Sequence, residues 1–181
     1  MNKGAITGAG ELELKKCTDH EIDLLVDISI RSYRQHYTYL WKDGGESYIR
    51  STFNAVRFQM ELADPNAVLF LVLNSQVAVG TVKLNIDKGI LHYPSQGSLE
   101  LERIYLLNEV AGRGVGKTVV EFVINFARGH NKKMVWLKAM DSSSALVFYQ
   151  KTGFAIVGNT VLEFPGLRDE FRRMLILGRE V

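Results

Sequence analysis

One segment in the middle of the chain constrains the fold more than any other. SLELERIYLL (98–107) alternates apolar and charged residues in its front half, as a strand does. AGRGVGKT (111–118) follows it and leads into a predicted helix over 116–129. Glycines let the backbone adopt positive φ and approach a ligand closely, and the N–H groups at a helix start attract anions. The segment therefore predicts a strand–loop–helix unit that binds an anion, above all a phosphate.

The other patterns place this unit in a mixed sheet. Thr18 and Glu21 form the pattern of a capping box, which predicts the start of the first helix. Helices are predicted from this box to about 39, over 46–62 and over 142–153, and strands over 11–17, 67–73, 77–86, 132–140, 154–164 and 171–178. We expect the last two strands to be antiparallel neighbours. This order predicts an α/β (α+β) fold with helices packed on the sheet.

Length and composition indicate one globular domain. The chain has 181 residues, of which 46% are hydrophobic and 23% charged. We assign 11–181 to the domain and 1–10, which is rich in small residues, to a mobile leader or a cloning remnant. Cys17 is the only cysteine, so no internal disulfide forms, which fits a cytoplasmic location. We expect its thiol to be half-buried and unreactive.

Charge and residue spacing argue against several classes of protein. The net charge is +2 and no basic block stands out, so we expect no nucleic acid and no membrane surface as partner. The longest apolar runs are too short to cross a bilayer. The histidines are scattered without a shared spacing, so we predict no metal site. A small-molecule partner is the expectation that follows.

The glycine-rich loop is also compatible with a phosphate-loop nucleotidase, because it loosely fits the Gly-Lys-Thr pattern of those enzymes. That class requires an apolar strand before the loop, whereas LELER is charged at every second position. It also requires an acidic residue that holds magnesium at the end of a second apolar strand. The best candidate is Asp141, but Lys138 interrupts its strand. The nucleotidase hypothesis is therefore weakly supported.

Two motifs resemble a different class. LERIYLLNEVAGRGVGKTVVEFVINFA resembles the acetyl-CoA-binding segment of the GNAT superfamily of N-acetyltransferases, whose loop motif Gln/Arg-x-x-Gly-x-Gly/Ala aligns with 111–116. SSSALVFYQKTGF resembles the second signature of that family, Asn-x-x-Ala-x-x-x-Tyr-x-x-x-Gly-Phe, at Ser142, Ala145, Tyr149, Gly153 and Phe154. The order of elements from about 11 to 178 also resembles the family fold. Two positions depart from the pattern, since Ala111 replaces Gln or Arg and Ser142 replaces Asn.

The resemblance implies a single-domain GNAT-like fold with a mixed central sheet, helices on both faces and a splayed strand pair. Acetyl-CoA would enter the wedge between 104–106 and 136–140, with its pyrophosphate in the loop. Backbone groups of Ile104 and Leu106 would pair with the pantetheine arm, and one N–H there would stabilise the oxyanion. The implied cofactor-binding residues are Ile104, Tyr105, Leu106, Ala111, Gly112, Arg113, Gly114, Val115, Gly116, Lys117, Thr118 and Ser142.

The resemblance also implies catalytic roles. Tyr149 matches the family tyrosine and would protonate the leaving thiolate, since the usual pKa of a phenol, about 10, is near that of a thiol. Glu102 would accept the proton of the amine, directly or through water, with Glu100 as the reserve candidate. The alternatives stay open that Tyr149 is a core aromatic and that both glutamates belong to a solvated or ion-paired strand face.

The acceptor is predicted less closely. The segment 32–49 is dense in aromatic residues, which could form a cage for a cationic amine or simply pack helix on helix: Tyr33, Tyr37, Tyr39, Trp41 and Tyr48. Asp43 and Glu46 could hold a distal ammonium. The pattern looks most like the bacterial polyamine and small-amine acetyltransferases. A non-catalytic acyl-CoA-binding sensor is the alternative function, and a homodimer is compatible with the resemblance.

Overall fold

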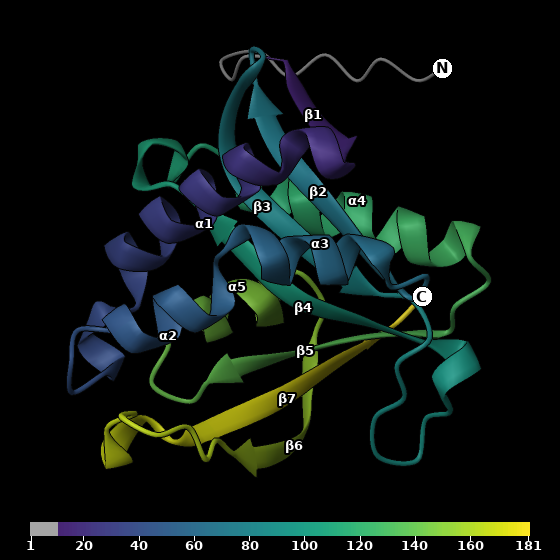
Figure 1. The fold of residues 1–181 in the computed structure, drawn as a ribbon. Coiled ribbons are helices and arrows are strands. Elements are labelled where there is room, and N and C mark those ends of the chain that lie inside the picture. The colour runs from purple at the N-terminus through teal and green to yellow at the C-terminus, as the bar shows by residue number, and fades with distance from the viewer. Residues whose placement is uncertain (1–10) are drawn as a thin grey trace.

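The sheet that organises the protein has seven strands in the order β1-β2-β3-β4-β5-β7-β6 (Figure 1). The computed structural model describes residues 11–181, so the predicted leader (1–10) lies outside the described residues. Every neighbouring pair is antiparallel except β4 and β5, which are parallel. The strands are β1 (Leu12–Lys16), β2 (Ala67–Asn74), β3 (Val77–Asn85), β4 (Ser98–Leu106), β5 (Met134–Met140), β6 (Ala155–Val161) and β7 (Arg173–Glu180). The predicted mixed sheet is confirmed.

Helices cover both faces of this sheet (Figure 1). The α-helices are α1 (Ile22–His36), α2 (Glu46–Thr52), α3 (Ala55–Ala63), α4 (Val115–Gly129) and α5 (Ala145–Lys151). Alternate residues of β2 divide between the two faces, as the period of a strand requires. Val68, Phe70 and Val72 pack in the core that contains α4, whereas Leu69, Leu71 and Leu73 pack in the core that contains α1 and α3.

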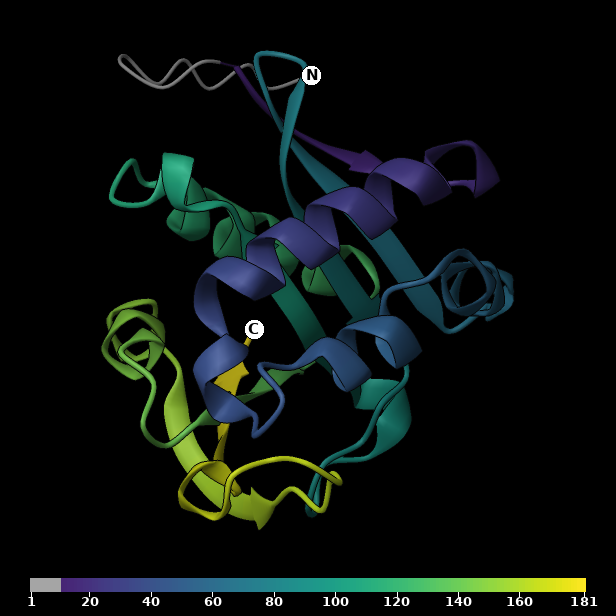
Figure 2. The same cartoon turned by 60° about the vertical axis from the view of Figure 1, so that its left-hand side comes forward.

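The parallel strands β4 and β5 separate after a short paired region. Their register covers only Ser98–Glu100 with Met134–Trp136, although β4 continues to Leu106 and β5 to Met140. Beyond that point β5 and β7 run away from β4 at an angle (Figures 1 and 2). Trp136 still belongs to the paired part, and its indole N–H donates to the Lys88 carbonyl at 2.7 Å. The wedge therefore begins after Trp136 rather than at it.

A β-bulge in β4 changes which way its side chains point. Lys83 pairs with Arg103 and Leu84 with Leu101, so Glu102 is the extra residue between them. Before the bulge Leu101 packs toward α4, and after it Ile104 does so too. An unbroken strand alternation would place Glu102 on the same face as Ile104, and the bulge removes this equivalence. Arg103 and Tyr105 thereby reach the face covered by α1 to α3.

The predicted helix over 46–62 consists of two helices, because Asn54 interrupts it. Its Oδ1 accepts from the Arg57 N–H at 2.9 Å and starts α3, and its Nδ2 donates to the Arg50 carbonyl at 2.9 Å and ends α2. A side chain that competes with the backbone in this way favours a helix boundary over a helix interior. The break lets Phe53 turn inward, where it is buried.

We expect Asn54→Ala to lower the free energy of unfolding by about 1 kcal/mol, the usual cost of losing an N-cap. Urea unfolding followed by circular dichroism measures this. Asn54→Ser retains an oxygen that can accept from the first turn of α3, so it should recover most of the loss. Equal stability of Asn54→Ala and the wild type would show that the cap contributes nothing.

Candidate functional site

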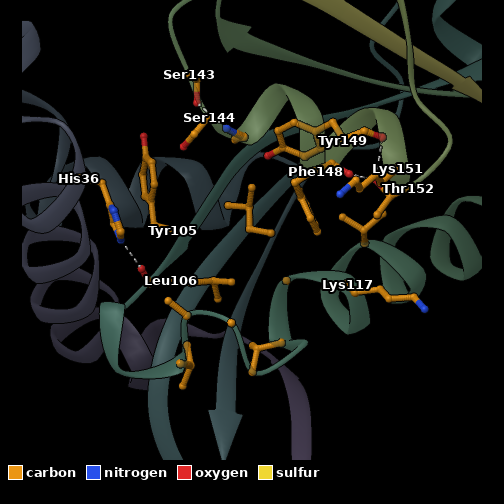
Figure 3. Close-up of a pocket in the computed structure, with 18 of the residues that line it drawn as sticks. His36, Tyr105, Leu106, Lys117, Ser143, Ser144, Phe148, Tyr149, Lys151 and Thr152 are labelled. Carbon is orange, nitrogen blue, oxygen red and sulfur yellow. Dashed lines mark hydrogen bonds between the residues drawn. The ribbon is translucent and has the colours of Figure 1, made fainter.

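A cleft of about 1350 Å³ opens where β4 and β5 diverge. Figure 3 shows its walls: His36 and Tyr105 lie on one side of the opening, and Phe148 and Tyr149 from α5 lie on the other. The glycine-rich loop and the first turn of α4 close one end. The cleft thus joins the two motifs that the sequence singled out, with Ile104, Tyr105, Leu106, Ala111, Gly112, Gly114, Val115, Gly116, Lys117, Ser142 and Tyr149 among its lining residues.

The loop before α4 presents backbone N–H groups to this cleft. Gly112 and Gly114 adopt positive φ of 72° and 81°, a conformation that side chains other than Asn or Asp rarely tolerate. Within residues 11–181, no group accepts a hydrogen bond from the N–H of Gly112, Gly114, Val115, Gly116 or Lys117. Unpaired N–H groups at a helix start, together with the helix dipole, make an anion site.

The exposed edge of β4 offers further backbone groups. The Leu107 N–H donates to the Val79 carbonyl at 2.8 Å, which fixes the phase of the β3–β4 ladder. Because hydrogen-bonding direction alternates along a strand, the N–H and C=O groups of Ile104 and Leu106 point away from β3 and into the wedge. An extended ligand with amide groups could therefore pair with this edge as an additional strand does.

Tyr149 lines the cleft from α5. Its side chain is buried, and its hydroxyl makes no hydrogen bond to any other residue of 11–181. Burial raises the pKa of Tyr149 above its usual value, and the nearby Tyr37 adds to this shift. The phenol consequently keeps its proton at neutral pH. A buried, protonated and unpaired hydroxyl at the cleft wall is able to donate to a ligand atom.

A smaller chamber of about 160 Å³ adjoins the cleft. Six residues line both cavities, so the two lie next to each other at the wedge: Tyr37, Ile104, Tyr105, Ser143, Ala145 and Tyr149. The other walls of the chamber come from β4 and β5, with further residues from α1, α2, the segment between these helices, the segment after β6 and β7. They include Tyr33, Trp41, Tyr48 and Phe164. The sequence prediction that the aromatic segment lies beside the site is compatible with this placement.

The aromatic residues also pack against each other, so both interpretations of this segment have a basis. Trp41 stacks on Tyr48 at 4.8 Å between ring centroids, and Tyr48 stacks on Tyr33 at 5.1 Å. The Trp41 indole N–H donates to the Tyr33 hydroxyl at 2.8 Å. Tyr39 instead lines the large cleft and is 47% exposed. Only the chamber-facing parts of this aromatic cluster are available to a ligand.

Glu102 lines the chamber and belongs to an ionic cluster beneath α3. Its carboxylate lies 2.9 Å from Lys83 Nζ and 3.4 Å from Arg103 Nε, and it accepts from Asn85 Nδ2 at 2.7 Å. Burial raises the pKa of Glu102, but the charges of Arg103 and Lys83 outweigh this effect and hold the pKa below its usual value. Glu102 is therefore ionised at neutral pH and only weakly basic.

Glu61 completes the cluster from α3. It is buried and pairs with Arg103, and its Oε1 lies 3.1 Å from Lys83 Nζ. Glu100, the reserve candidate, is buried and accepts from Asn85 Nδ2 at 2.7 Å. It lines neither cavity. Of the two predicted carboxylates, the structure thus brings Glu102 to the site.

Some predicted residues lie elsewhere. Arg113 and Thr118 do not line the cleft, and the Thr118 hydroxyl donates back to the Gly114 carbonyl. Asp43 accepts from the N–H groups of Gly45 and Ser47 at the start of α2. Glu46 pairs with Arg34 at 3.0 Å. The carboxylates proposed for a distal ammonium therefore do not reach the chamber.

Cys17 is fully buried in the core rather than half-buried as predicted. Burial raises the pKa of its thiol to about 12, so it stays protonated at neutral pH. In the described part of the chain, no group of three or more potential metal ligands comes together. A search of the same residues finds no helix long and apolar enough to cross a membrane.

Sequence reasoning missed the contribution of the end of α1. His36 Nε2 lies 3.0 Å from the Leu106 carbonyl oxygen, at the mouth of the cleft (Figure 3). The Gln35 side chain accepts from the Asn108 N–H at 2.8 Å and anchors the start of the glycine-rich loop. Both contacts join residues about seventy positions apart in the chain. No local pattern could have revealed them.

Comparison with known proteins defines the class. The sequence model of the acetyltransferase (GNAT) family matches residues 28–154, which include both motifs. The chain belongs to this family. A curated relative, an uncharacterized N-acetyltransferase of Lactobacillus delbrueckii subsp. lactis, is 32% identical over 108 residues. That match spans 59% of this chain and 62% of the length of the relative.

Solved structures agree on the fold. The PaiA N-acetyltransferase of Thermoplasma acidophilum, crystallised with coenzyme A, superposes with a TM-score of 0.72 and 18% identity, covering 94% of this chain and 99% of that one. A chimera based on the spermidine N-acetyltransferase SpeG of Vibrio cholerae gives a TM-score of 0.71 and 17% identity, covering 94% and 96%. Because the sequence identities are low, these superpositions establish only that the chain has the single-domain GNAT fold.

Proposed function

We propose that this protein is an acetyl-CoA-dependent N-acetyltransferase that acts on a small primary amine. The observation that carries the proposal is that the cleft and the chamber adjoin at the β4–β5 wedge, where they share six lining residues. The large cleft has an anion site at one end for the pyrophosphate of the coenzyme. Beside it lies the edge of β4 that faces away from β3, where the pantetheine arm would pair and where the Leu106 carbonyl contacts His36 Nε2. The chamber beyond the wedge has room for a small acceptor.

The chemistry follows from the groups at the junction. The neutral amine attacks the thioester carbonyl, a C–N bond forms, and the resulting oxyanion needs a hydrogen-bond donor. The backbone N–H of Ile104 or Leu106 supplies it. When the C–S bond breaks, the Tyr149 hydroxyl donates a proton to the thiolate. The amine nitrogen loses a proton when the amide forms, and water carries this proton back to the Tyr149 oxygen. No net charge therefore builds up in the cleft.

Glu102 acts on the acceptor side. Its carboxylate is ionised but weakly basic, which suits orienting the amine or an intervening water better than removing a proton outright. The proposal therefore keeps Glu102 at the acceptor end of the site and changes its predicted role from general base to positioning group. The homodimer stays a prediction, and the polyamine preference indicated by the sequence is one that the charges lining the chamber argue against.

We expect Glu102→Gln to lower kcat/KM for the amine about 10-fold and to leave the Kd of acetyl-CoA unchanged. This is less than the roughly 10²–10⁴-fold contribution of a group that transfers the proton itself, because Glu102 only positions the amine. Glu100→Gln is the matched control, because Glu100 is on the same strand but lines neither cavity. Steady-state kinetics with both variants measures the difference. Equal loss in the two variants would assign the effect to the strand face as a whole.

A thermal-shift titration tests the proposal and its two alternatives together. Acetyl-CoA at about 100 times its Kd should stabilise the fold by about 2.7 kcal/mol, which raises Tm visibly. A rise of Tm with acetyl-CoA but not with Mg-ATP supports the proposal. Release of CoA that depends on added amine then distinguishes an enzyme from a non-catalytic sensor. A rise with Mg-ATP alone would favour the nucleotidase hypothesis and overturn the proposal.

A further inference from the structure

The chamber beside the wedge restricts what the acceptor can be. Its volume is about 160 Å³, below the roughly 300–1,000 Å³ typical of pockets for drug-sized ligands. Its walls are dominated by aromatic and aliphatic side chains. A ligand that enters here must therefore be compact, and it must leave most of its hydration water outside.

The charges that line the chamber do not favour a second ammonium. Among the lining residues within 11–181, Glu102 is the only carboxylate, whereas Arg103 and Lys138 are cationic. Glu102 already interacts with Lys83, Arg103 and Asn85. A buried cation without a counter-charge is costly, so a polycationic acceptor finds no compensation at this end.

The acidic residues of the aromatic segment do not supply that compensation. Asp43 caps α2 and Glu46 pairs with Arg34, and neither lines the chamber. Several of the aromatic ring faces that could attract a second cation are also covered by neighbouring rings. Trp41, Tyr48 and Tyr33 stack on one another rather than surrounding an open cage.

We infer that the acceptor is a compact monoamine with a flat aromatic body, and that this chamber discriminates against di- and polyamines. The inference rests on the proposed acetyl transfer and deepens it. The aromatic body packs against the tyrosine-rich wall, where offset or edge-to-face contacts are favourable. The single amine faces the wedge between Glu102 and Tyr149, where the thioester carbonyl would lie.

The test compares phenethylamine, putrescine and spermidine as acceptors for the wild-type protein at saturating acetyl-CoA. We expect kcat/KM for phenethylamine to exceed that for both polyamines by at least about 10-fold, since a desolvated site penalises an unpaired charge strongly. A higher kcat/KM for putrescine or spermidine would overturn the inference and leave the acetyltransferase function intact. No turnover of any of the three, with acetyl-CoA still bound, would contradict the proposed function itself.

A charge variant adds an independent readout. Leu162 lines the chamber and is partly buried. Leu162→Glu supplies a counter-charge for a second ammonium, and Leu162→Gln is the uncharged variant of the same size. We expect the ratio of kcat/KM for putrescine to that for phenethylamine to rise about 10-fold in Leu162→Glu relative to Leu162→Gln, the scale on which one polar contact shifts specificity. An unchanged ratio, with Tm showing both variants folded, would mean that the chamber does not select acceptors by charge.

Discussion

Tyr149→Phe should lower kcat by about 10²-fold or more, the usual contribution of a positioned proton donor, while the Kd of acetyl-CoA stays the same. The hydroxyl has no partner among the described residues, so its loss removes no contact that holds the fold together. The ring, which packs against Phe148 and Phe154, remains in the variant. Stopped-flow and steady-state assays of CoA release measure kcat, and calorimetry measures the Kd.

The pH dependence provides a second check on this residue. Burial raises the pKa of Tyr149, so the phenol keeps its proton through neutral and mildly alkaline pH. Deprotonation of Tyr149 should therefore cause no loss of wild-type kcat as the pH rises from about 7 to about 9. Phe148→Leu is the control for a packing effect, since Phe148 lines the same cleft without a hydroxyl. Normal turnover by Tyr149→Phe would remove Tyr149 from the mechanism and restore its interpretation as a core aromatic.

Gly112→Asp should raise the Kd of acetyl-CoA about 30-fold relative to Gly112→Asn. Gly112 has φ of +72°, and nothing lies within 4 Å of a Cβ built there, so both side chains fit. Asn and Asp also tolerate this backbone conformation better than other residues. The two variants differ by one charge, which within a few ångströms of a phosphate costs about 2 kcal/mol or more.

Isothermal titration calorimetry at low and high salt distinguishes the electrostatic cause from a local distortion. The gap between the Asp and Asn variants should narrow as salt screens the repulsion. If both bind acetyl-CoA equally at low salt, the loop does not hold the pyrophosphate. The anion site would then have to lie elsewhere along the cleft.

Much of the fold could be predicted because short sequence signals fix it locally. The capping box of Thr18 and Glu21 is present with both of its hydrogen bonds. Ser75 and Gln76 take positive φ in the tight turn of the β2–β3 hairpin, and Gly153 takes positive φ just after α5. Each of these features depends on residues within a few positions of one another. The mixed sheet follows from the order of these elements.

The rest depends on contacts that sequence spacing does not encode. The bulge at Glu102 is visible only once β3 and β4 are aligned, and it moves Arg103 and Tyr105 to the acceptor face. The partners that lower the pKa of Glu102 come from β3 and from the next residue of β4. The groups that bind the Asp43 and Glu46 carboxylates come from the start of α2 and from α1. The sequence therefore indicated the coenzyme end of the site more closely than the acceptor end.

The measurement that tests the central claim most directly is product formation from isotope-labelled acetyl-CoA and a small primary amine. The account predicts one labelled N-acetyl product per CoA released, with the rate reduced in Tyr149→Phe and the coenzyme Kd raised in Gly112→Asp. Tight binding of acetyl-CoA without any labelled amide, across mono-, di- and polyamines, would contradict it. The adjoining cleft and chamber would then belong to an acyl-CoA sensor.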